Sequence, residues 1–597
     1  MQPKYSVNQH TVSILLGWVQ AKTIAIPEIQ RPFVWESVKV RDLMDSLYRG
    51  YPVGYIITWK NPDTKLKDGS MSSGKKIIID GQQRIMAMRA AILGLKVVNS
   101  SYKEVRVVIS FNPVTEEFAT RTPSIQNNTL WIEDISEILG KDGNLLTFVR
   151  DYQKKNPEVD ENIIVSNVQK LIDIKNRQIG VIDLEESLDI ETITDIFVRI
   201  NSKGVKLSQA DFVMSKIAAN EAHGGALLRK AIDYFSHSIQ DPSFIKDIQD
   251  IDVNFANTNY YQKFSWLSNA NVDIYVPDYT DIIRVAFLSE FKRGKLSDLV
   301  SLLSGRNFET RVYEDEISKE SFEKLSNGVL AFVSQTEYER FVMILRSTGY
   351  IDSAMLRSQS VLNFAYAIFL ILRAENFNPA EIGMYVSRWL VMSILTRRYS
   401  GSAETAFEYD IKRVVKGGIR EFLQEIEQGS LSDAFWNTTL VRDLETSVLS
   451  SPFFNIFLAA QVKNNDKGFL SKEISVSDLI LHRGDIHHIF PRDYLKKLGK
   501  EKNDYNQIAN YVYMQSEINI SIGNKSPKEY FALLQQQIAQ GTPQYGAIVT
   551  TDGLLENLRA NCLPEEVLAM DINDYDGFLA KRRGLIAQKI KEYYFKL

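Results

Sequence analysis

Apolar positions near the N-terminus follow a helical period in two places. Val40, Leu43, Met44 and Leu47 recur at helical spacing, after Ser37, which can cap a helix, and before Gly50, which can end one. A second helix is expected to carry Ile85, Met88 and Ile92 on one side. These segments predict amphipathic helices that cover one face of a sheet.

Four N-terminal segments have the composition of strands, namely 54–59, 76–79, 105–111 and 178–184. The second is a β-branched run that leads directly into a glycine turn. We expect these segments to pair in an N-terminal sheet. Strands and helices together predict an α/β domain in this part of the chain.

Helical periodicity then dominates from about Leu207 to residue 450, with few prolines and no repeat of fixed period. The segments 360–372 and 385–396 are mostly apolar, so other helices must bury them. A stretch rich in Asn, Asp and Tyr, 254–281, interrupts the pattern. This block contains no motif that indicates a particular chemistry. We interpret it as a spacer that transmits a conformational state between the two ends of the chain.

Length and composition limit the number of domains and the kinds of partner that we expect. The chain has 597 residues, a formal net charge of −4 and one cysteine, Cys562. That length predicts three or four domains of ordinary size, and the net charge gives no global attraction to nucleic acid. No apolar run reaches the ~20 residues of a membrane span, and the N-terminus lacks signal-peptide features, so we expect a cytoplasmic protein with no membrane partner.

The most unusual chemistry lies near the C-terminus, where three of the six histidines occur. His487 and His488 are adjacent and precede Ile489-Phe490-Pro491. Hydrolysis of a phosphodiester near neutral pH needs a group that accepts a proton from water, and imidazole has the matching pKa, which suits His488. A divalent cation must also hold the phosphate. The structural alternative is a pair of histidines at a turn, with asparagines capping the strands.

This stretch resembles an HNH, or ββα-metal, nuclease, with Asn510 before an apolar strand and Asn519 nine positions later. The resemblance implies that His488 is the general base, that His487 and Asn519 hold the metal, and that Asn510 ties the loop together and orients the base. It makes Asp485 a supporting residue or an additional ligand. Because the motif ends in Asn rather than His, Mg²⁺ or Mn²⁺ is favoured over zinc.

A second candidate site follows the strand at 76–79. The sequence Asp80-Gly81-Gln82-Gln83-Arg84 joins a strand to a helix N-terminus, where free N–H groups and the helix dipole favour an anion. Arg84 adds a planar positive charge. The alternative is an ordinary Asp-Gly turn whose Gln and Arg only cap the helix.

This turn, with Ile-Pro-Glu-Ile-Gln-Arg-Pro-Phe-Val-Trp at 26–35 and Phe-Val-Arg-Ile-Asn-Ser-Lys-Gly at 197–204, resembles the DUF262 family, which has a ParB/sulfiredoxin-like core. Many members carry a C-terminal DUF1524 HNH nuclease and act as modification-dependent type IV restriction enzymes similar to GmrSD, BrxU and SspE. Since there is no Walker P-loop, the resemblance assigns an NTP (GTP, UTP, CTP or ATP) to this turn. The residues implied are Gln30, Arg31, Asp80, Gly81, Gln82, Gln83, Arg84, Arg199 and Asn201.

Basic residues supply the candidates for DNA contact. Arg492, Lys496 and Lys525 flank the histidines, and further clusters occur at 397–398, 412–420 and 581–591. For any single cluster the alternative is an ordinary solvated helix face. The last helix has apolar positions up to Tyr594, so we expect it to pack against the nuclease domain or against a second copy of the chain in a homodimer.

Together these features predict an α+β multidomain protein. Residues 1–215 form a ParB-like nucleotide-binding sensor, 216–450 a mostly helical transmission domain, and 451–597 an HNH endonuclease. The expected function is NTP-regulated cleavage of double-stranded, modified phage DNA. Two alternatives stay open: a nucleotide-switched clamp that binds DNA without cutting it, and a toxin-like nuclease that acts on host DNA.

Overall fold

The structure is a computed structural model that describes residues 4–21, 23–25, 35–60, 76–99, 104–140, 145–185, 188, 209–220, 222–270, 272–482 and 485–597. The chain divides into two compact units. Unit 1 comprises 1–230 with 299–322, and unit 2 comprises 231–298 with 323–597. Within the described ranges no helix combines the length and the apolar character needed to cross a bilayer.

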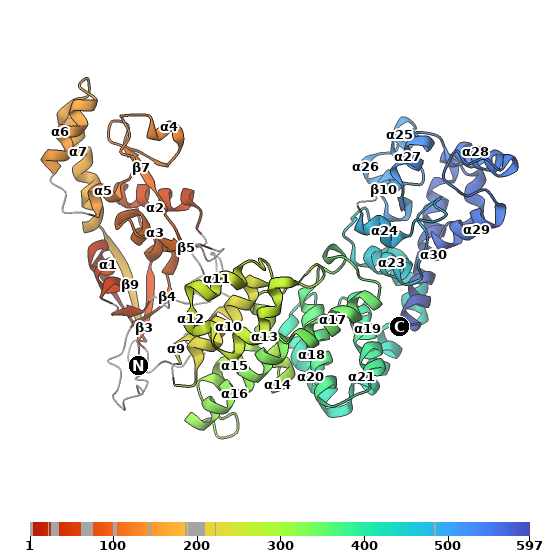
Figure 1. The fold of residues 1–597 in the computed structure, drawn as a ribbon, viewed down its shortest axis with the longest axis horizontal. Coiled ribbons are helices and arrows are strands. Elements are labelled where there is room, and N and C mark those ends of the chain that lie inside the picture. Colours follow the sequence, from red (N-terminus) through yellow and green to blue (C-terminus); the bar gives the residue numbers. More distant parts are fainter. Residues whose placement is uncertain are drawn as a thin grey trace. The chain divides into compact units, whose positions relative to one another are not determined.

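Unit 1 is built on a five-stranded mixed sheet in the order β1-β9-β3-β4-β2. Figure 1 labels β9, β3 and β4 of this sheet. β9 pairs antiparallel with β1 and parallel with β3, and β4 pairs antiparallel with β3. The strands predicted at 54–59, 76–79 and 178–184 are therefore confirmed as neighbours. The strand bounds are β1 Tyr5–Thr11, β2 Ile24–Ala25, β3 Ile56–Lys60, β4 Lys76–Asp80 and β9 Gln178–Leu184.

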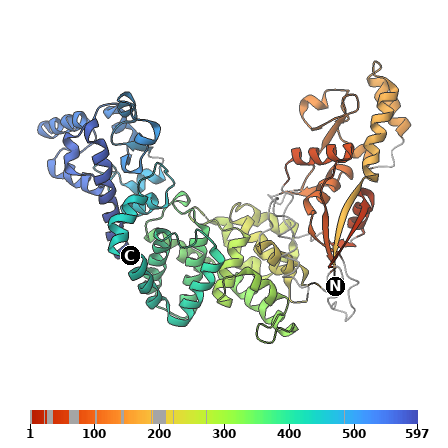
Figure 2. The ribbon, with the colours of Figure 1, turned by 180° about the vertical axis from the view of Figure 1, so that it is seen from behind.

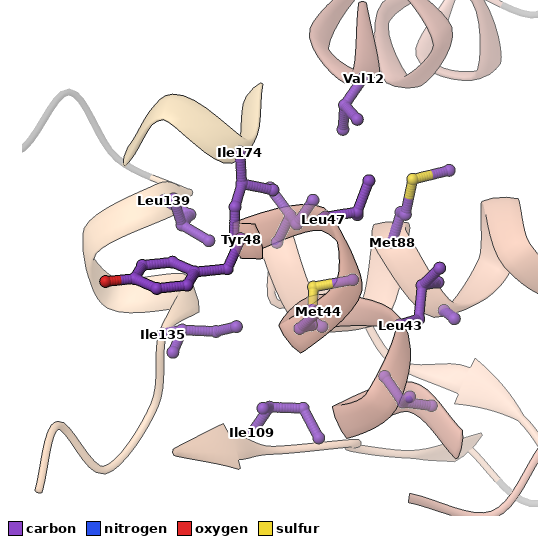
Figure 3. Packing of buried hydrophobic residues seen from close by; sticks show 14 of the residues in the cluster. Val12, Leu43, Met44, Leu47, Tyr48, Met88, Ile109, Ile135, Leu139 and Ile174 are labelled. Carbon is purple, nitrogen blue, oxygen red and sulfur yellow. The ribbon is translucent and has the colours of Figure 1, made fainter. Parts of the chain in front are cut away.

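Helices α1 (Val12–Gln20), α2 (Ser37–Arg49) and α3 (Gln82–Ile92) contribute the main core of this unit. The predicted apolar positions of α2 and α3 are buried there, and Figure 3 shows Leu43, Met44 and Leu47 among them. The helix start differs by one residue from the prediction. Ser37 is the first helical residue, and the N-cap Glu36 makes no side-chain capping bond.

The segment 105–111 does not join the large sheet, contrary to the prediction. It divides into β6 (Glu104–Val105), paired with β5 (Val97–Val98), and β7 (Ile109–Asn112), paired with β8 (Glu117–Thr120). Arg106 lies between the two, and its guanidinium donates to the carbonyls of Ala90 and Val107. The side chain thus ties this part of the chain to α3, and β7 forms a separate two-stranded sheet.

Short helices complete the N-terminal part, and α6 and α7 lie side by side in both views (Figures 1 and 2). Their bounds are α4 Pro123–Gln126, α5 Ser136–Leu139, α6 Leu145–Lys155, α7 Glu161–Ile172 and η1 Asp173–Asn176.

The chain beyond residue 208 is helical up to the C-terminal region, as predicted. α18 (Gln359–Ala374) is buried over almost its whole length and packs against α14 (Tyr279–Phe291) and α19 (Pro379–Leu395). The other helices are α9 Gln209–Ala219, α10 Gly225–Ser238, α11 Phe244–Ile251, α12 Val253–Ala256, α13 Asn259–Phe264, η2 Ser265–Asn269, α15 Leu296–Leu303, α16 Asp315–Phe332, α17 Gln335–Ser347, η3 Ser353–Met355, α20 Ala403–Gly417, α21 Ile419–Ser430, η4 Phe435–Thr439 and α22 Leu440–Asp443.

The C-terminal part of unit 2 holds a two-stranded hairpin within its own apolar core. The hairpin strands are β10 (Asp485–His488) and β11 (Tyr511–Met514). The surrounding helices are α23 Pro452–Lys463, α24 Val476–Leu481, α25 Arg492–Lys497, α26 Lys502–Tyr505, η5 Ile508–Asn510, α27 Ser516–Ile522, α28 Pro527–Gln540, α29 Thr551–Ala560, η6 Glu565–Ala569, η7 Ile572–Asp574 and α30 Tyr575–Phe595.

Candidate nuclease site and candidate nucleotide site

The histidine motif lies on the antiparallel hairpin β10–β11, and α27 follows directly after it. His487 is opposite Val512 and His488 is opposite Tyr511. The short helices α25, α26 and η5 lie in the segment between the two strands, and the paired strands followed by α27 are the elements expected of a ββα-metal nuclease.

The two predicted metal ligands lie on different elements of the C-terminal part. Val512 of β11 belongs to the same buried cluster as Ile518 and Ile522 of α27, so the strand and the helix contribute to one core. His487 is directly opposite Val512 and shares its face of the hairpin. Asn519 follows Ile518 in α27 and is half-buried. That the imidazole and the carboxamide hold one ion stays a prediction.

These two side chains suit a hard divalent ion, since they offer one imidazole nitrogen and one amide oxygen and leave positions for water and phosphate. Among the described residues no group of three or more His, Cys, Asp or Glu side chains is close enough to hold a metal ion. The predicted metal site therefore needs the amide oxygen of Asn519 as a ligand. The side chain of Asp485 lies outside the described atoms.

His488 is half-buried and held through one ring nitrogen. Its Nε2 lies 3.0 Å from Oδ1 of Asn506, and its ring meets that of Tyr511 edge to face at 5.1 Å between centroids. Because an amide oxygen only accepts, Nε2 donates, and the lone pair of the neutral ring is on Nδ1. This tautomer is inferred from the hydrogen bond.

The surroundings of His488 favour a neutral ring. Burial lowers the pKa of His488 below its ordinary value, and the positive charge of Arg492 lowers it further, against the hydrogen bond to Asn506. The imidazole therefore stays uncharged at neutral pH, with Nδ1 able to accept a proton. Sequence reasoning missed Asn506, whose only signal is its place in the loop that joins the two strands.

Asn510 is fully buried and clamps the chain next to the histidines. Its Oδ1 accepts the N–H of Phe490 at 2.9 Å, and its Nδ2 donates to the carbonyls of Phe490 at 3.1 Å and Tyr505 at 3.2 Å. The end of β10 is thereby tied to the loop that carries Asn506. These contacts are those of a residue that holds the loop rather than one that reacts.

The predicted DNA-contacting cations differ in their availability. Arg492 and Lys496 are exposed and lie one helical turn apart on α25. Lys525 instead donates to the carbonyls of Ser521 and Ile522 at the end of α27, and its ammonium lies 5.8 Å from the Tyr545 ring centroid. Its charge is engaged by the protein itself.

Several cations of the last helix bond to other groups of the protein. Arg582 is buried, Lys581 bonds to Glu566, and Lys589 pairs with Asp466 at 2.5 Å. These residues hold α30 to its surroundings.

The predicted nucleotide turn has the expected strand–glycine–helix geometry. Gly81 has a φ of 94° and precedes the first residue of α3. A Cβ at this position would lie 3.0 Å from a side-chain atom of Ile56 and 3.2 Å from Nη1 of Arg84. A left-handed φ and this close approach together require glycine.

The cation of this turn, Arg84, is directed to the protein. Its Nη1 donates to the carbonyl of Tyr55 at 2.7 Å and lies 3.6 Å from the carboxylate of Asp80. The side chain is 25% exposed, so part of the guanidinium can still face a ligand. Four other predicted members of the site, Gln30, Arg31, Arg199 and Asn201, lie outside the described residues.

A polar cluster that sequence reasoning missed joins strands of the same sheet. The carboxylate of Asp183 accepts from Lys76 at 2.6 Å, from Thr58, and from Asn8 at 3.0 Å. Burial opposes ionisation, yet these donors hold the pKa of Asp183 below its ordinary value. The cluster fastens β1, β9, β3 and β4 beneath the helices.

Comparison with known proteins supports the N-terminal assignment. Residues 15–218 match the family described as GmrSD restriction endonuclease, N-terminal domain. The chain is also 21% identical, over 95% of its own length and 96% of the relative's, to an uncharacterized protein of Methanocaldococcus jannaschii. The matched domain contains β3, β4, α3 and the Asp80–Arg84 turn, and it supports a relationship to restriction endonucleases that act on DNA.

Proposed function

We propose that this chain is a metal-dependent DNA endonuclease of the modification-dependent restriction type, with an HNH site at its C-terminus and an NTP-responsive N-terminal domain. The GmrSD-type N-terminal domain supports the restriction class. The observation that supports the nuclease assignment is the hairpin, which carries His487 and His488 side by side and holds the His488 ring by one nitrogen.

In this proposal His488 is the general base. Asn506 fixes the ring through Nε2, so that Nδ1 takes the proton of the attacking water. Because the pKa of His488 is lowered, the ring is in its basic form at neutral pH. Cleavage should therefore fall as the pH drops through a value below the ordinary 6.5 of histidine.

Mg²⁺ or Mn²⁺, when bound, would hold the scissile phosphate and stabilise the leaving oxygen. His487 and Asn519 are the residues that would hold it. Asn510 keeps the end of β10 in place, and Arg492 and Lys496 contact the DNA backbone from α25. Modified phage DNA is the proposed substrate.

The N-terminal domain would bind an NTP at the Asp80–Arg84 turn. The N-terminus of α3 offers main-chain N–H groups, and the partly exposed Arg84 offers positive charge. Binding or hydrolysis there would gate the nuclease. Hydrolysis assays with GTP, UTP, CTP and ATP determine which nucleotide is used.

The test compares His488→Ala with a matched control, His482→Ala. His482 lies six residues earlier, is exposed, and contacts only the carbonyl of Asp478 in the described structure. His488→Ala should lower the rate of nicking of modified DNA about 10²- to 10⁴-fold, as expected for loss of a general base. His482→Ala should nick at the wild-type rate, and both variants should hydrolyse NTP normally.

The assay also separates the alternatives. Wild-type protein that retains DNA with Mg²⁺ or Mn²⁺ but creates no new ends would be a clamp, not a nuclease. If His488→Ala abolished NTP hydrolysis together with nicking, the division of labour between the two ends would be wrong.

A further inference from the structure

A buried arginine lies beneath the hairpin without a carboxylate partner. Arg582 of α30 is 1% exposed. Its Nη1 donates to the carbonyl of Ala509 at 2.9 Å and its Nη2 to that of Asn561 at 3.2 Å. Among the described residues no Asp or Glu pairs with it, and its Nε has no acceptor.

This burial is costly for a charged group. A guanidinium removed from water needs compensating charge or complete hydrogen bonding, and two carbonyls supply only part of it. Burial accordingly lowers the pKa of Arg582 to about 10. An apolar side chain of similar volume would fill the same space without the desolvation free energy of a guanidinium, so stability alone does not explain an arginine here.

The acceptor that Arg582 selects is next to the nuclease motif. Ala509 directly precedes Asn510, whose side chain holds both main-chain groups of Phe490. The Asn510 carbonyl in turn accepts the N–H of Ile489, the residue after His488. The guanidinium therefore holds the Ala509 carbonyl in place, directly before the residue whose hydrogen bonds hold Ile489 and Phe490.

We propose that Arg582 is a positioning residue of the nuclease site, which sets the place of the 509–510 backbone and, through Asn510, the end of β10 that carries His488. The proposal rests on the proposed nuclease function. Arginine suits this role because its planar fork bonds two carbonyls at once, whereas a lysine reaches only one with fixed geometry.

The test uses Arg582→Met, Arg582→Lys and the neighbouring control Arg583→Met. Arg583 pairs with Glu445 at 3.8 Å and makes no hydrogen bond to Ala509 or Asn510 in the described structure. Arg582→Met should lower kcat for nicking about 10- to 100-fold, the range found for residues that orient catalytic groups, and change KM for DNA less than about 3-fold. Arg582→Lys should recover part of kcat, and Arg583→Met should match wild type.

A second readout does not need catalysis. Hydrogen exchange at the Phe490 amide, which donates to Asn510, should accelerate about 10-fold or more in Arg582→Met, while amides of α18 exchange as in wild type. Arg582→Lys, which keeps the charge, should give an intermediate rate and serves if the methionine variant does not fold.

The outcomes are distinguishable. If wild-type protein does not nick DNA, the proposed function fails, and exchange at Phe490 alone decides the role of Arg582. If kcat falls only in proportion to the folded fraction and the Phe490 amide exchanges normally, Arg582 is merely structural. Wild-type kcat and exchange in Arg582→Lys would also overturn the proposal.

Discussion

The Asp80–Arg84 turn and the β10–β11 hairpin both place a basic side chain where a strand ends, but they use it differently. Arg84 directs its guanidinium to the carbonyl of Tyr55 and to Asp80. In the part of the chain that the structure describes, the His488 ring is hydrogen-bonded at Nε2, and burial favours its neutral form. The first group is a permanent charge shared with the protein, and the second is a base with one nitrogen left to react.

This difference predicts whether a substitution at each site should change stability, binding or reaction rate. A group bound mainly to its own fold contributes to stability and to binding, so its loss is expected to be graded. A proton acceptor depends on the groups that hold it, so losses around His488 should lower the rate of nicking, and loss of a buried clamp such as Asn510 should also lower stability. Substitutions at three positions sharpen or break this contrast.

The largest effect is expected for Asn510→Ala. It leaves the N–H and C=O of Phe490 and the carbonyl of Tyr505 buried without this partner. We expect a loss of about 3 kcal/mol in the free energy of unfolding, since each buried unpaired group costs about 1–3 kcal/mol. Denaturant unfolding measures the stability, and nicking by the folded fraction should fall about 100-fold.

Asn524→Ala is the matched control, because Asn524 is an exposed asparagine five residues beyond Asn519. It should change stability by less than about 0.5 kcal/mol. Equal effects of the two substitutions would contradict the clamping role of Asn510.

A smaller effect is expected at Asn506, where the direction of the shift in the pH–rate profile can also be predicted. Its hydrogen bond to His488 favours the protonated ring and so raises the pKa of His488 against burial. Asn506→Ala should therefore move the acidic limb of the pH–rate profile to lower pH, and Asn506→Asp should move it to higher pH. Asn506→Ala should also lower the maximal rate about 10-fold because the ring loses its orientation, whereas Asn506→Asp keeps an acceptor for Nε2.

The profile of wild-type protein at matched temperature and salt is the reference for these shifts. Limbs that move in the same direction in both variants, or not at all, would show that Asn506 does not control the proton-accepting group.

The smallest effect on nicking is expected for Arg84→Ala. Loss of the bond to Tyr55 should cost about 1 kcal/mol of stability. Nicking without NTP should stay within about 2-fold of wild type, whereas NTP hydrolysis should be lost, since Arg84 supplies the cation of the proposed site. Arg89→Ala, five residues along α3, is the control for hydrolysis, and unchanged hydrolysis in Arg84→Ala would remove this turn from the nucleotide site.

The sequence was informative where short-range rules operate. A β-branched run followed by glycine predicted β4 and the start of α3, and helical spacing predicted the buried side of α2. Prediction from the sequence failed where a long-range contact determines which strands pair. The segment 105–111 has strand composition, yet Arg106 bonds to Ala90 and Val107, and β7 pairs with β8 and bridges Ile132 instead of joining the large sheet.

The same reason separates the predicted and missed parts of the site. Histidines and asparagines at motif spacing were visible in the sequence. Asn506 and Arg582 were not, because their importance comes from a ring nitrogen and from a carbonyl 73 positions away. From the sequence alone, Arg582 was one of several cations on an apparently solvated helix, and only its burial gives it a different meaning.

The terminal helix α30 has a practical consequence for dissecting this protein. Arg582 bonds to Ala509, while Tyr593 donates to the carbonyl of Thr348 and Tyr594 to Glu427, both far upstream of residue 451. A fragment beginning at 451 would retain both tyrosines but lose the surfaces that cover them. The part after residue 451 and the preceding helices are therefore expected to melt as one cooperative body, and an excised C-terminal fragment would be prone to aggregate.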